Sequence, residues 1–296
     1  MMPNFDGHIR LRLGELSARV DPLGAELRSL RRAGDEYLWQ DANSIWAHAA
    51  PILFPFVGRL NGGGFEHDGR FYTMPMHGFA GASWFEPRDR QQQQAHRAVL
   101  QLRDNAQTRA CFPFEFRLRV SFTLNPQGID VGYEVLNPGA QALPFALGSH
   151  PAFALGDGPL QDWRIEFDKA EAPEVYRLDG GLLAERPVPF CFEPERSIAL
   201  SPTTFVGDAL IFKNINSTCI SLVHRSQGPR LKLWTGDAPH LGLWAAPNTG
   251  FVCIEPWFGV DEDKQAPVAL AEKSGLQRLA PGTRFACGYR IEVGDH

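Results

Sequence analysis

The stretch that decides the fold is Phe114-Glu-Phe-Arg-Leu-Arg-Val-Ser-Phe-Thr-Leu124, in which every even-numbered position is apolar and every odd-numbered position is polar. Successive side chains of a β-strand point to opposite faces, so this period of two predicts a strand with one buried face and one solvated face. Asn125-Pro-Gln-Gly128 then supplies a turn, and the alternation resumes from Ile129 to Val135. The two segments together predict a β-hairpin.

Short runs of the same kind recur along the whole chain. Glycine (29 residues) and proline (23 residues) separate them at short intervals, and Ala269–Ser274 could form a helical turn or two. Many short strands with frequent turn signals are typical of a sandwich or barrel. Because no shift in composition and no internal repeat marks a boundary, we expect one all-β domain over residues 1–296 with little helix. The other predicted strands are Ile9–Leu13, Ala25–Leu30, Ala98–Leu102, Arg164–Phe167, Ala209–Phe212, Ile220–Val223, Arg230–Trp234 and Arg284–Glu292.

The composition argues against several classes of partner. The chain has 296 residues, of which 44% are hydrophobic and 21% are charged, so it can bury a sizeable core. The formal net charge is −5, and no basic block offers a surface for nucleic acid or anionic lipid. Residues 1–10 lack the apolar core of a signal peptide, and no apolar stretch approaches the roughly 18 residues of a membrane helix. We expect neither a nucleic acid nor a membrane partner.

The cysteines give no sign of a disulfide framework or a metal site. They are five in number, widely spread, and without a CxxC or Cys/His metal spacing. Buried small hydrophobic residues in a reducing compartment account for such a set, and we expect a cytoplasmic protein. The cysteines are Cys111, Cys191, Cys219, Cys253 and Cys287.

The most informative anomaly is a carboxylate in a strand that is apolar on both faces. Phe251-Val-Cys-Ile-Glu-Pro-Trp257 places Val252 and Ile254 on one face and Glu255 on the other. Burial of a carboxylate is costly and raises its pKa, and such a group is a candidate general base. Pro256 favours an extended Glu255 and removes a ladder donor, so we expect Glu255 at a strand end. The alternative is a structural glutamate paired with an arginine.

Two histidines repeat this pattern. His150 lies between the apolar runs Leu143–Ser149 and Pro151–Phe153, where an imidazole is either a hydrogen-bonded core group or a functional one. His77 lies in Met74-Pro-Met-His-Gly-Phe-Ala80, where a glycine lets the backbone come close to a ligand. A pKa near neutrality suits a histidine to give or take a proton at cellular pH.

Arg59 ends a further apolar run, Pro51-Ile-Leu-Phe-Pro-Phe-Val-Gly-Arg59. A guanidinium there can anchor a carboxylate, a phosphate or sugar hydroxyls, and the alternative is a surface arginine in a turn. His77, His150 and Glu255 could instead bind a metal, but the HxH pair that commonly supplies two ligands from one strand is absent. Neither a GxSxG elbow nor a phosphate loop with its lysine occurs. We expect no metal and no cofactor.

Six short motifs stand out when the chain is read in order. They are Pro51-Ile-Leu-Phe-Pro-Phe-Val-Gly-Arg59, His77-Gly-Phe-Ala80, Gly148-Ser-His-Pro-Ala-Phe153, Asp208-Ala-Leu-Ile-Phe-Lys-Asn214, Leu241-Gly-Leu-Trp244 and Cys253-Ile-Glu-Pro-Trp-Phe-Gly259. Together and in this order they resemble the aldose 1-epimerase family, most closely the less characterised bacterial branch of the galactose mutarotase-like superfamily. The resemblance extends from about Leu11 to Ile291, essentially the whole chain.

The resemblance implies a large antiparallel β-supersandwich with a sugar cleft on one face. It also implies an isomerase, a mutarotase that interconverts the α and β anomers of an aldose without a cofactor. By position, Glu255 matches the family's general base, His150 its general acid and His77 the second histidine of the site. Arg59 resembles the substrate-binding arginine, and Asp208 resembles the aspartate that binds sugar hydroxyls.

Two departures from the family pattern bear on the substrate. The family often carries an arginine and then a polar residue after His-Gly-Phe-Ala, and here those positions are Gly81 and Ala82. In the related hexose-6-phosphate 1-epimerases that arginine is expected to serve the phosphate, so its loss favours a free aldose. The usual aromatic residue before Leu-Gly-Leu-Trp is His240, which adds a polar group to the expected cleft. Trp244 and Trp257 are expected either to line the cleft or to pack in the core.

Other functions remain possible on the same fold. A catalytically silent sugar-binding or sensing protein would not require an acid and a base, and the retention of both histidines and Glu255 argues against it. A hexose-6-phosphate 1-epimerase is a second alternative. A glycoside hydrolase is more distant, because hydrolases typically need two carboxylates and only Glu255 stands out. The expected activity rests on the site residues, since a fold alone does not carry a function.

Overall fold

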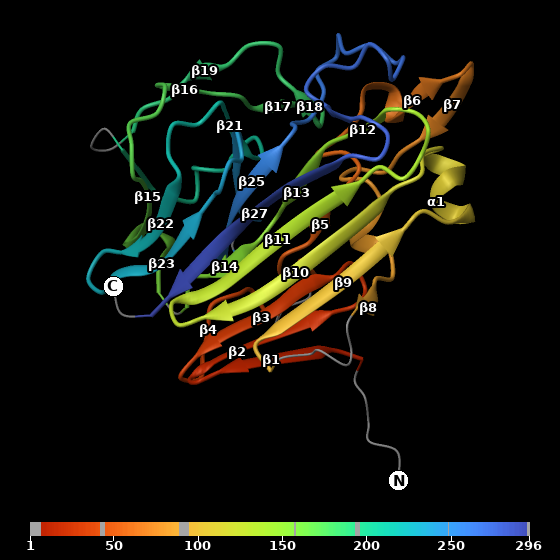
Figure 1. The fold of residues 1–296 in the computed structure, drawn as a ribbon. Coiled ribbons are helices and arrows are strands. Elements are labelled where there is room, and N and C mark those ends of the chain that lie inside the picture. The colour runs from red at the N-terminus through yellow and green to blue at the C-terminus, as the bar shows by residue number, and fades with distance from the viewer. Residues whose placement is uncertain are drawn as a thin grey trace.

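The computed structural model describes residues 7–41, 45–88, 95–156, 158–192, 196–247 and 249–294. Nearly all of the regular structure is antiparallel β-sheet (Figure 1), which confirms the predicted fold class. In this view a nine-stranded sheet crosses the front of the molecule, strands of a six-stranded sheet lie behind it, and a four-stranded sheet lies below.

The nine-stranded sheet contains the hairpin predicted from the alternating sequence. Its strands are, in spatial order, β20 (Ser197–Ala199), β15 (Trp163–Phe167), β22 (Cys219–His224), β23 (Gly228–Trp234), β27 (Arg284–Val293), β11 (Gly128–Leu136), β10 (Arg117–Asn125), β9 (Arg97–Arg103) and β8 (Glu86–Arg88). Strands β10 and β11 pair along their full lengths, from Arg117 opposite Leu136 to Asn125 opposite Gly128.

The strand β10 is shorter than the sequence pattern predicts. It begins at Arg117 rather than at Phe114. The backbone of Phe116 exchanges hydrogen bonds with Asp104 instead of a strand partner: Phe116 N donates to the Asp104 carboxylate at 3.2 Å, and Asp104 N donates to Phe116 O at 3.2 Å. Phe114 and Phe116 are nevertheless buried, so the apolar alternation continues beyond the sheet.

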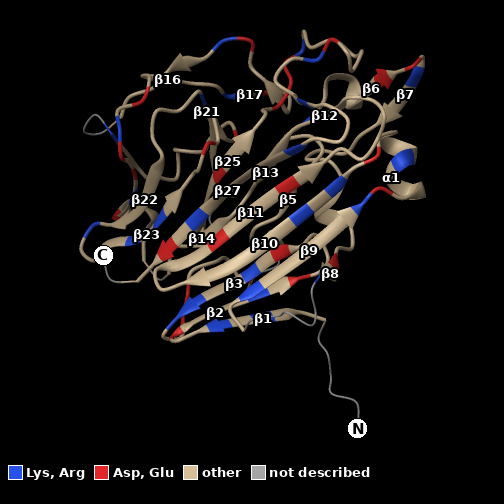
Figure 2. Ribbon diagram, viewed as in Figure 1, with Lys and Arg blue, Asp and Glu red and all other residues tan. Residues whose placement is uncertain are grey.

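The two faces of this sheet differ as the period of two requires. The even-numbered side chains of β10 are buried and the odd-numbered ones are half-buried. Charged residues recur along β9, β10, β11 and β27 (Figure 2). Arg119 donates to Glu134 at 3.2 Å and Arg290 donates to Asp130 at 2.6 Å across neighbouring strands. Exposed pairs of this kind add little stability each, and they keep a broad sheet face solvated.

The other sheets complete the layers. The six-stranded sheet runs β21 (Leu210–Lys213), β24 (His240–Trp244), β25 (Phe251–Phe258), β13 (Leu147–Ser149) and β5 (Ile52–Leu53), with β14 (Ala152–Ala154) also paired to β25. The four-stranded sheet runs β1 (Ile9–Leu13), β2 (Leu16–Asp21), β3 (Glu26–Arg32) and β4 (Asp35–Glu36). Two-stranded ribbons are β6 (Gly64–His67) with β7 (Arg70–Thr73), β12 (Leu143–Phe145) with β26 (Gln277–Leu279), β16 (Glu174–Val175) with β19 (Val188–Pro189), and β17 (Leu178–Asp179) with β18 (Leu182–Leu183).

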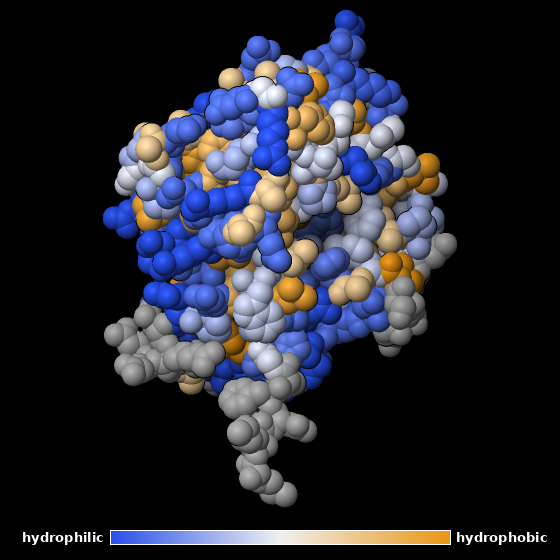
Figure 3. Space-filling model, turned by 90° about the vertical axis from the view of Figure 1, so that its right-hand side faces the viewer, coloured by the Kyte–Doolittle hydropathy of each residue, from blue (hydrophilic) through white to orange (hydrophobic). Residues whose placement is uncertain are grey.

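One apolar core joins the three larger sheets. Its buried members include Leu11 of β1, Phe122 of β10 and Ile254 of β25, and they extend along the chain to Val293. We therefore propose that residues 1–296 act as one domain. Seen from the side (Figure 3), polar and apolar side chains are interspersed over the surface, and a hollow opens near the middle of that face.

Helix is scarce. The described residues contain one α-helix, which the sequence analysis did not predict. This helix, α1 (Ala106–Cys111), begins with a capping box. The side chain of Asn105 accepts a hydrogen bond from the backbone N–H of Thr108, and the side chain of Thr108 accepts one from the backbone N–H of Asn105. The 3₁₀ segments are η1 (Asn61–Gly63), η2 (Ala80–Ala82) and η3 (Leu160–Asp162). In the described ranges, no helix has the length and apolar character needed to cross a membrane.

The expectation of helical turns at Ala269–Ser274 is wrong. The segment forms tight turns, with Glu272 N donating to Ala269 O at 3.0 Å. The backbone N–H of Leu270 donates to Glu66 O at 2.8 Å, which ties the segment to β6.

The core face of β10 yields a stability prediction. Replacing Phe122, which is 1% exposed, by alanine removes a ring from the shared core. Phe122→Ala should lower the free energy of unfolding by about 3–5 kcal/mol, the usual cost of such a cavity. Thr123→Ala, on the outer face of the same strand, should cost less than about 1 kcal/mol. Urea denaturation of both variants checks this, and equal losses would show that the alternation does not separate core from solvent.

Candidate active site

The strand β25 carries the candidate base in its interior. Val252 and Ile254 enter the main core, whereas Cys253 and Glu255 lie on the opposite face, as the sequence predicts. We call this second face, which Trp244 of the neighbouring β24 shares, the site face. Glu255 is 1% exposed and lies opposite Gly242 of β24.

The expectation that Glu255 ends a strand is wrong, although Pro256 does interrupt the ladder. Ile254 N donates to Pro151 O at 3.2 Å, so the nitrogen of Pro256, two residues on, faces the same side of β25. On that side β25 pairs with β14 up to Cys253 and with β13 again from Trp257. The missing donor of the proline therefore falls in the gap between β13 and β14.

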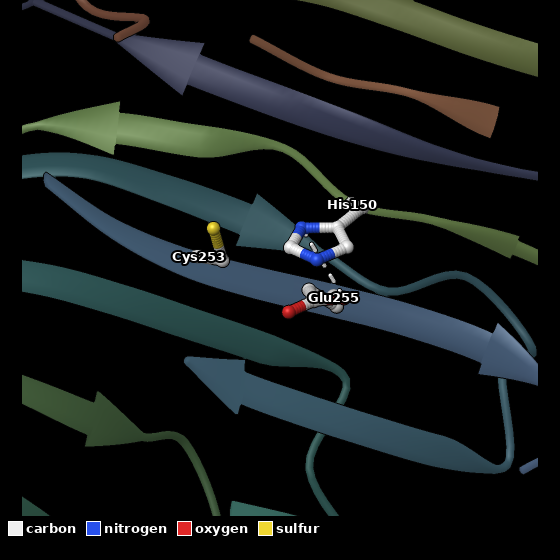
Figure 4. Close-up of side chains that lie close together, drawn as sticks. All are labelled: His150, Cys253 and Glu255. Carbon is white, nitrogen blue, oxygen red and sulfur yellow. Dashed lines mark ion pairs between the residues drawn. The ribbon is translucent and has the colours of Figure 1, made fainter. Parts of the chain in front are cut away.

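This gap holds His150. Its backbone N–H donates to Pro51 O at 3.0 Å, and its ring reaches over β25 toward Glu255 (Figure 4). His150 Nδ1 lies 3.4 Å from Glu255 Oε2, and neither atom has a hydrogen-bond partner among the described residues. The sequence left open whether His150 is a core histidine or a functional one, and the structure places it against the candidate base.

Burial shifts the pKa of each member of this pair toward its neutral form. Desolvation raises the pKa of Glu255 well above its ordinary value, and the charges of Asp261 and Asp208 add to the rise. The Trp257 indole N–H faces the carboxylate and offsets part of this rise in pKa. Desolvation, followed by the proximity of His77, holds the pKa of His150 well below its ordinary value. Each group therefore favours its neutral form, with the one transferable proton of the pair on Glu255 and no net charge.

His77 is fixed beside His150 by the backbone of Gly58. His77 N donates to Gly58 O at 2.8 Å, and Gly58 N donates to His77 Nδ1 at 3.0 Å. Because Nδ1 accepts, the ring proton is on Nε2. The rings of His77 and His150 meet edge to face with centroids 5.8 Å apart. Burial, and then the charge of Arg59, lowers the pKa of His77 to about 4, so this ring is neutral at pH 7.

Asp261 is a buried carboxylate of the site that the sequence analysis did not identify. It is 6% exposed and accepts a hydrogen bond from Arg59 N at 2.9 Å. A Cβ at Gly58 would lie 2.0 Å from its carboxyl carbon, so the glycine makes room for the carboxylate. Burial raises the pKa of Asp261 to about 6. The signal was weak, since the residue stands among other acidic residues just after the Glu-Pro-Trp motif.

Aromatic side chains surround the pair. The Trp46 ring lies 5.0 Å from that of His150, centroid to centroid, and stacks on Phe251 at 5.4 Å. Trp244 meets His150 edge to face at 5.7 Å, so this predicted residue belongs to the site. Trp257 is 3% exposed, and its indole occupies the space where Gly242 has no side chain. This apolar lining keeps water from the carboxylate.

A third histidine lies near the site and was also missed. His48 is largely exposed, and its Nδ1 lies 3.3 Å from Glu26 Oε2, a buried carboxylate that also accepts from the backbone of Ala49 and Ala50. The proximity of His48 contributes to the low pKa of both His77 and His150. A polar residue within Ala-His-Ala-Ala-Pro is the same signal that marked His150.

The remaining predicted residues lie at the periphery. Arg59 and Asp208 are exposed; Arg59 lies against Gly181, and the charge of Asp208 reaches Glu255 and Asp261. His240 lies on the site face opposite Trp257, two residue pairs from Glu255 along the ladder of β24 and β25. Its Nδ1 accepts from Asn214 N at 3.3 Å, and burial lowers its pKa to about 4.

The arrangement suits proton transfer to and from a small polar molecule. It places a carboxylate, two neutral imidazoles and peripheral hydrogen-bonding groups on one sheet face. The sequence analysis considered His77, His150 and Glu255 as possible metal ligands. In the structure, the donor atoms that lie within 4.8 Å of one another are those of His150, Cys253 and Glu255, so Cys253 takes the place of His77.

Known proteins match this chain over nearly its whole length. The chain is 29% identical over 299 residues to the chromosomal LacX protein of Lactococcus lactis subsp. lactis, covering 96% of this chain and 99% of that protein. Its fold matches that of a galactose mutarotase related enzyme from Lactobacillus acidophilus with a TM-score of 0.90, 29% identity and 97% of each chain covered. A galactose mutarotase-like protein from Lactobacillus casei ATCC 334 also matches with a TM-score of 0.90, at 26% identity, covering 97% of this chain and 100% of that one.

The family profile described as aldose 1-epimerase covers residues 7–287. It thus includes every element of the site, from the segment that carries Trp46 to the strand that carries Glu255. The chain belongs to the aldose 1-epimerase family.

Proposed function

We propose that the protein interconverts the α and β anomers of an aldose by general acid–base ring opening. The observation that supports this most directly is the buried pair of Glu255 and His150, whose facing atoms lie 3.4 Å apart without other partners. A closed aldose offers this pair two oxygens, the C1 hydroxyl and the ring oxygen. Ring opening moves one proton off the first and one onto the second.

The roles follow from that exchange. Glu255 takes the proton of the C1 hydroxyl while His150 gives a proton to the ring oxygen, and the bond between C1 and the ring oxygen breaks. The open aldehyde rotates about the C1–C2 bond. The reverse transfers then close the ring on the other face of C1, which restores both groups. The cycle needs no oxidant, reductant or covalent intermediate.

In this proposal the one transferable proton moves between Glu255 and His150, so the exchange needs no bulk water. A closed sugar reacts when the proton is on His150, and the open sugar closes when it is on Glu255. Apolar surroundings favour the neutral form of the pair, in which Glu255 carries the proton. The indole N–H of Trp257, which faces the carboxylate, supports the charged form, in which His150 carries it. The proposed reaction therefore passes through the less populated, charged form of the pair.

The surrounding polar groups are proposed to hold the sugar while it is open. The Nε2–H of His77 faces away from Gly58 and can donate to a sugar oxygen. Arg59 and Asp208, at the periphery, can donate to and accept from hydroxyls. His240 and Trp244 on the site face offer a further polar contact and an aromatic surface.

A protein that only binds sugars would gain little from this pair. Burial of Glu255 Oε2 and His150 Nδ1 without partners costs stability, and proton transfer is a use that explains the cost. We therefore place the mutarotase ahead of a silent sugar-binding protein.

The first prediction tests the base and the acid. Glu255→Gln keeps the size of the side chain but cannot accept the C1 hydroxyl proton, so kcat for anomer exchange should fall by about 10²–10⁴-fold. His150→Asn should have a similar effect, and the double variant should be little worse than either single one, because both groups serve one transition state. Polarimetry or NMR exchange over a panel of aldoses measures this.

Glu66→Gln is the matched control, because Glu66 lies on β6 and supplies no contact to the pair. Near-normal exchange in Glu255→Gln on the best substrate would make Glu255 a structural carboxylate. The sugar-binding function would then be preferred.

The second prediction concerns pH. The reactive pair carries one proton, so exchange should be fast between the lowered pKa of His150 and the raised pKa of Glu255, and slower on both sides. The alkaline limb reports loss of the shared proton. Asp261→Asn removes a negative charge that raises the pKa of Glu255, so this limb should move to lower pH. The pH dependence of kcat measures the shift.

Asp263→Asn is the control, because it removes a nearby carboxylate whose charge acts on Glu262 instead. The other groups that act on the pair, namely His48, His77, Asp208, Cys253 and Trp257, remain in both variants. An alkaline limb that stays in place in Asp261→Asn, or moves to higher pH, contradicts the assignment.

The third prediction concerns the charge of the substrate. With glycine at position 81, neutral aldoses should exchange faster than their 6-phosphates. A Cβ at Gly81 would lie 3.5 Å from Ile52 O, an ordinary contact, so a side chain can be added there. Gly81→Arg should raise kcat/KM for a 6-phosphate relative to the free sugar by about tenfold, the scale of one charge-assisted hydrogen bond. Gly81→Gln is the uncharged control, and a wild-type preference for phosphates contradicts the prediction.

A further inference from the structure

Three donor atoms of different chemistry meet at the buried end of the site. They belong to the imidazole of His150, the thiol of Cys253 and the carboxylate of Glu255, and they lie within 4.8 Å of one another. Figure 4 shows Cys253 and Glu255 on the same face of β25, with the ring of His150 above them. The proton-transfer proposal uses the imidazole and the carboxylate and gives the thiol no task.

The geometry is close to that of a three-residue zinc site. Tetrahedral Zn²⁺ bound at about 2.0–2.3 Å by nitrogen, oxygen and sulfur ligands keeps its donor atoms about 3.3–3.6 Å apart. His150 Nδ1 and Glu255 Oε2 already stand at 3.4 Å, and neither has another partner. All three donor atoms lie within 4.8 Å of one another, so a closer approach of the sulfur would complete the set.

The electrostatics also favour a divalent cation. A thiolate, a carboxylate and a neutral imidazole around M²⁺ sum to zero charge, which an apolar lining tolerates far better than an unpaired ion. The lining is formed by Trp46, Trp244 and Phe251. Asp261 lies close enough for its charge to act on Glu255, and it adds a negative potential without a ligand atom of its own.

We propose that His150, Cys253 and Glu255 form a binding site for a thiophilic divalent transition metal such as Zn²⁺, and that the bound metal blocks the pair. Binding replaces the thiol proton of Cys253 by a metal–sulfur bond and releases that proton to solvent, together with the transferable proton of the pair, whether Glu255 or His150 carries it. The metal occupies the nitrogen and oxygen that would transfer protons. It is therefore an inhibitor of the site and not a cofactor, and this inhibitory part rests on the proposed function.

The experiment separates metal binding from catalysis. Co²⁺ is added to the chelator-treated full chain, and the thiolate-to-Co²⁺ absorption band in the near ultraviolet is followed during the titration. The wild type and Cys219→Ala, which lacks a buried cysteine of β22, should give the band, and Cys253→Ala should not. In parallel, Zn²⁺ at buffered free concentrations should inhibit anomer exchange in the wild type, reversibly with EDTA. Cys253→Ala should keep its basal exchange and need at least about tenfold more Zn²⁺.

The outcomes are distinct. A wild type without the thiolate band, or a Cys253→Ala variant that keeps it, overturns the metal site. Equal sensitivity to Zn²⁺ in the wild type and Cys253→Ala overturns the inhibitory role. If the chelated wild type shows no anomer exchange at all, the proposed function fails, while the Co²⁺ spectrum still decides the metal site.

Discussion

The burial of one carboxylate in an apolar strand is the constraint on which the site depends. Glu255 is enclosed by a sheet whose other face is the core, so its ionised form is costly and its proton is held more tightly than in water. A partner that can share this proton must come within a few ångströms, and His150 does so from the gap that Pro256 leaves in the ladder. Pro256, the gap in the ladder and His150 thus act together to offset the free-energy cost of burying the Glu255 carboxylate.

A second level of organisation supports this pair through the backbone. Gly58 holds His77 with two hydrogen bonds, and it has no side chain where the carboxylate of Asp261 lies. His77 itself adopts φ 65°, a left-handed conformation that costs a non-glycine residue free energy. The next residue, Gly78, is equally constrained, since a Cβ there would lie 2.2 Å from Phe54 O. Close backbone approach, rather than side-chain packing, therefore sets the position of the second histidine.

The sequence predicts the strands well and the three-dimensional neighbours of the site only in part. The alternation in residues 114–124 fixes which side chains are buried, because the period of two is a local property. The chemistry of Glu255 is similarly visible as a polar residue among apolar ones. Its place in the interior of a strand was predicted wrongly, since Pro256 sits where a neighbouring ladder is broken, a long-range fact. Asp261 was missed because its proximity to the site is a long-range property, whereas His48 carried a local signal, a polar residue in an apolar run, that was not used.

The strict alternation along β25 has a consequence for how such a site can vary. Odd-numbered positions such as Cys253 and Glu255 face the site, and even-numbered positions such as Val252 and Ile254 face the core. A point substitution at an odd position can therefore retune reactivity while the hydrophobic packing is inherited unchanged. Gain or loss of a single residue would exchange the two sets and send the carboxylate into the core. The strand β25 can therefore vary by substitution at its site-facing positions, but not by insertion or deletion of a residue.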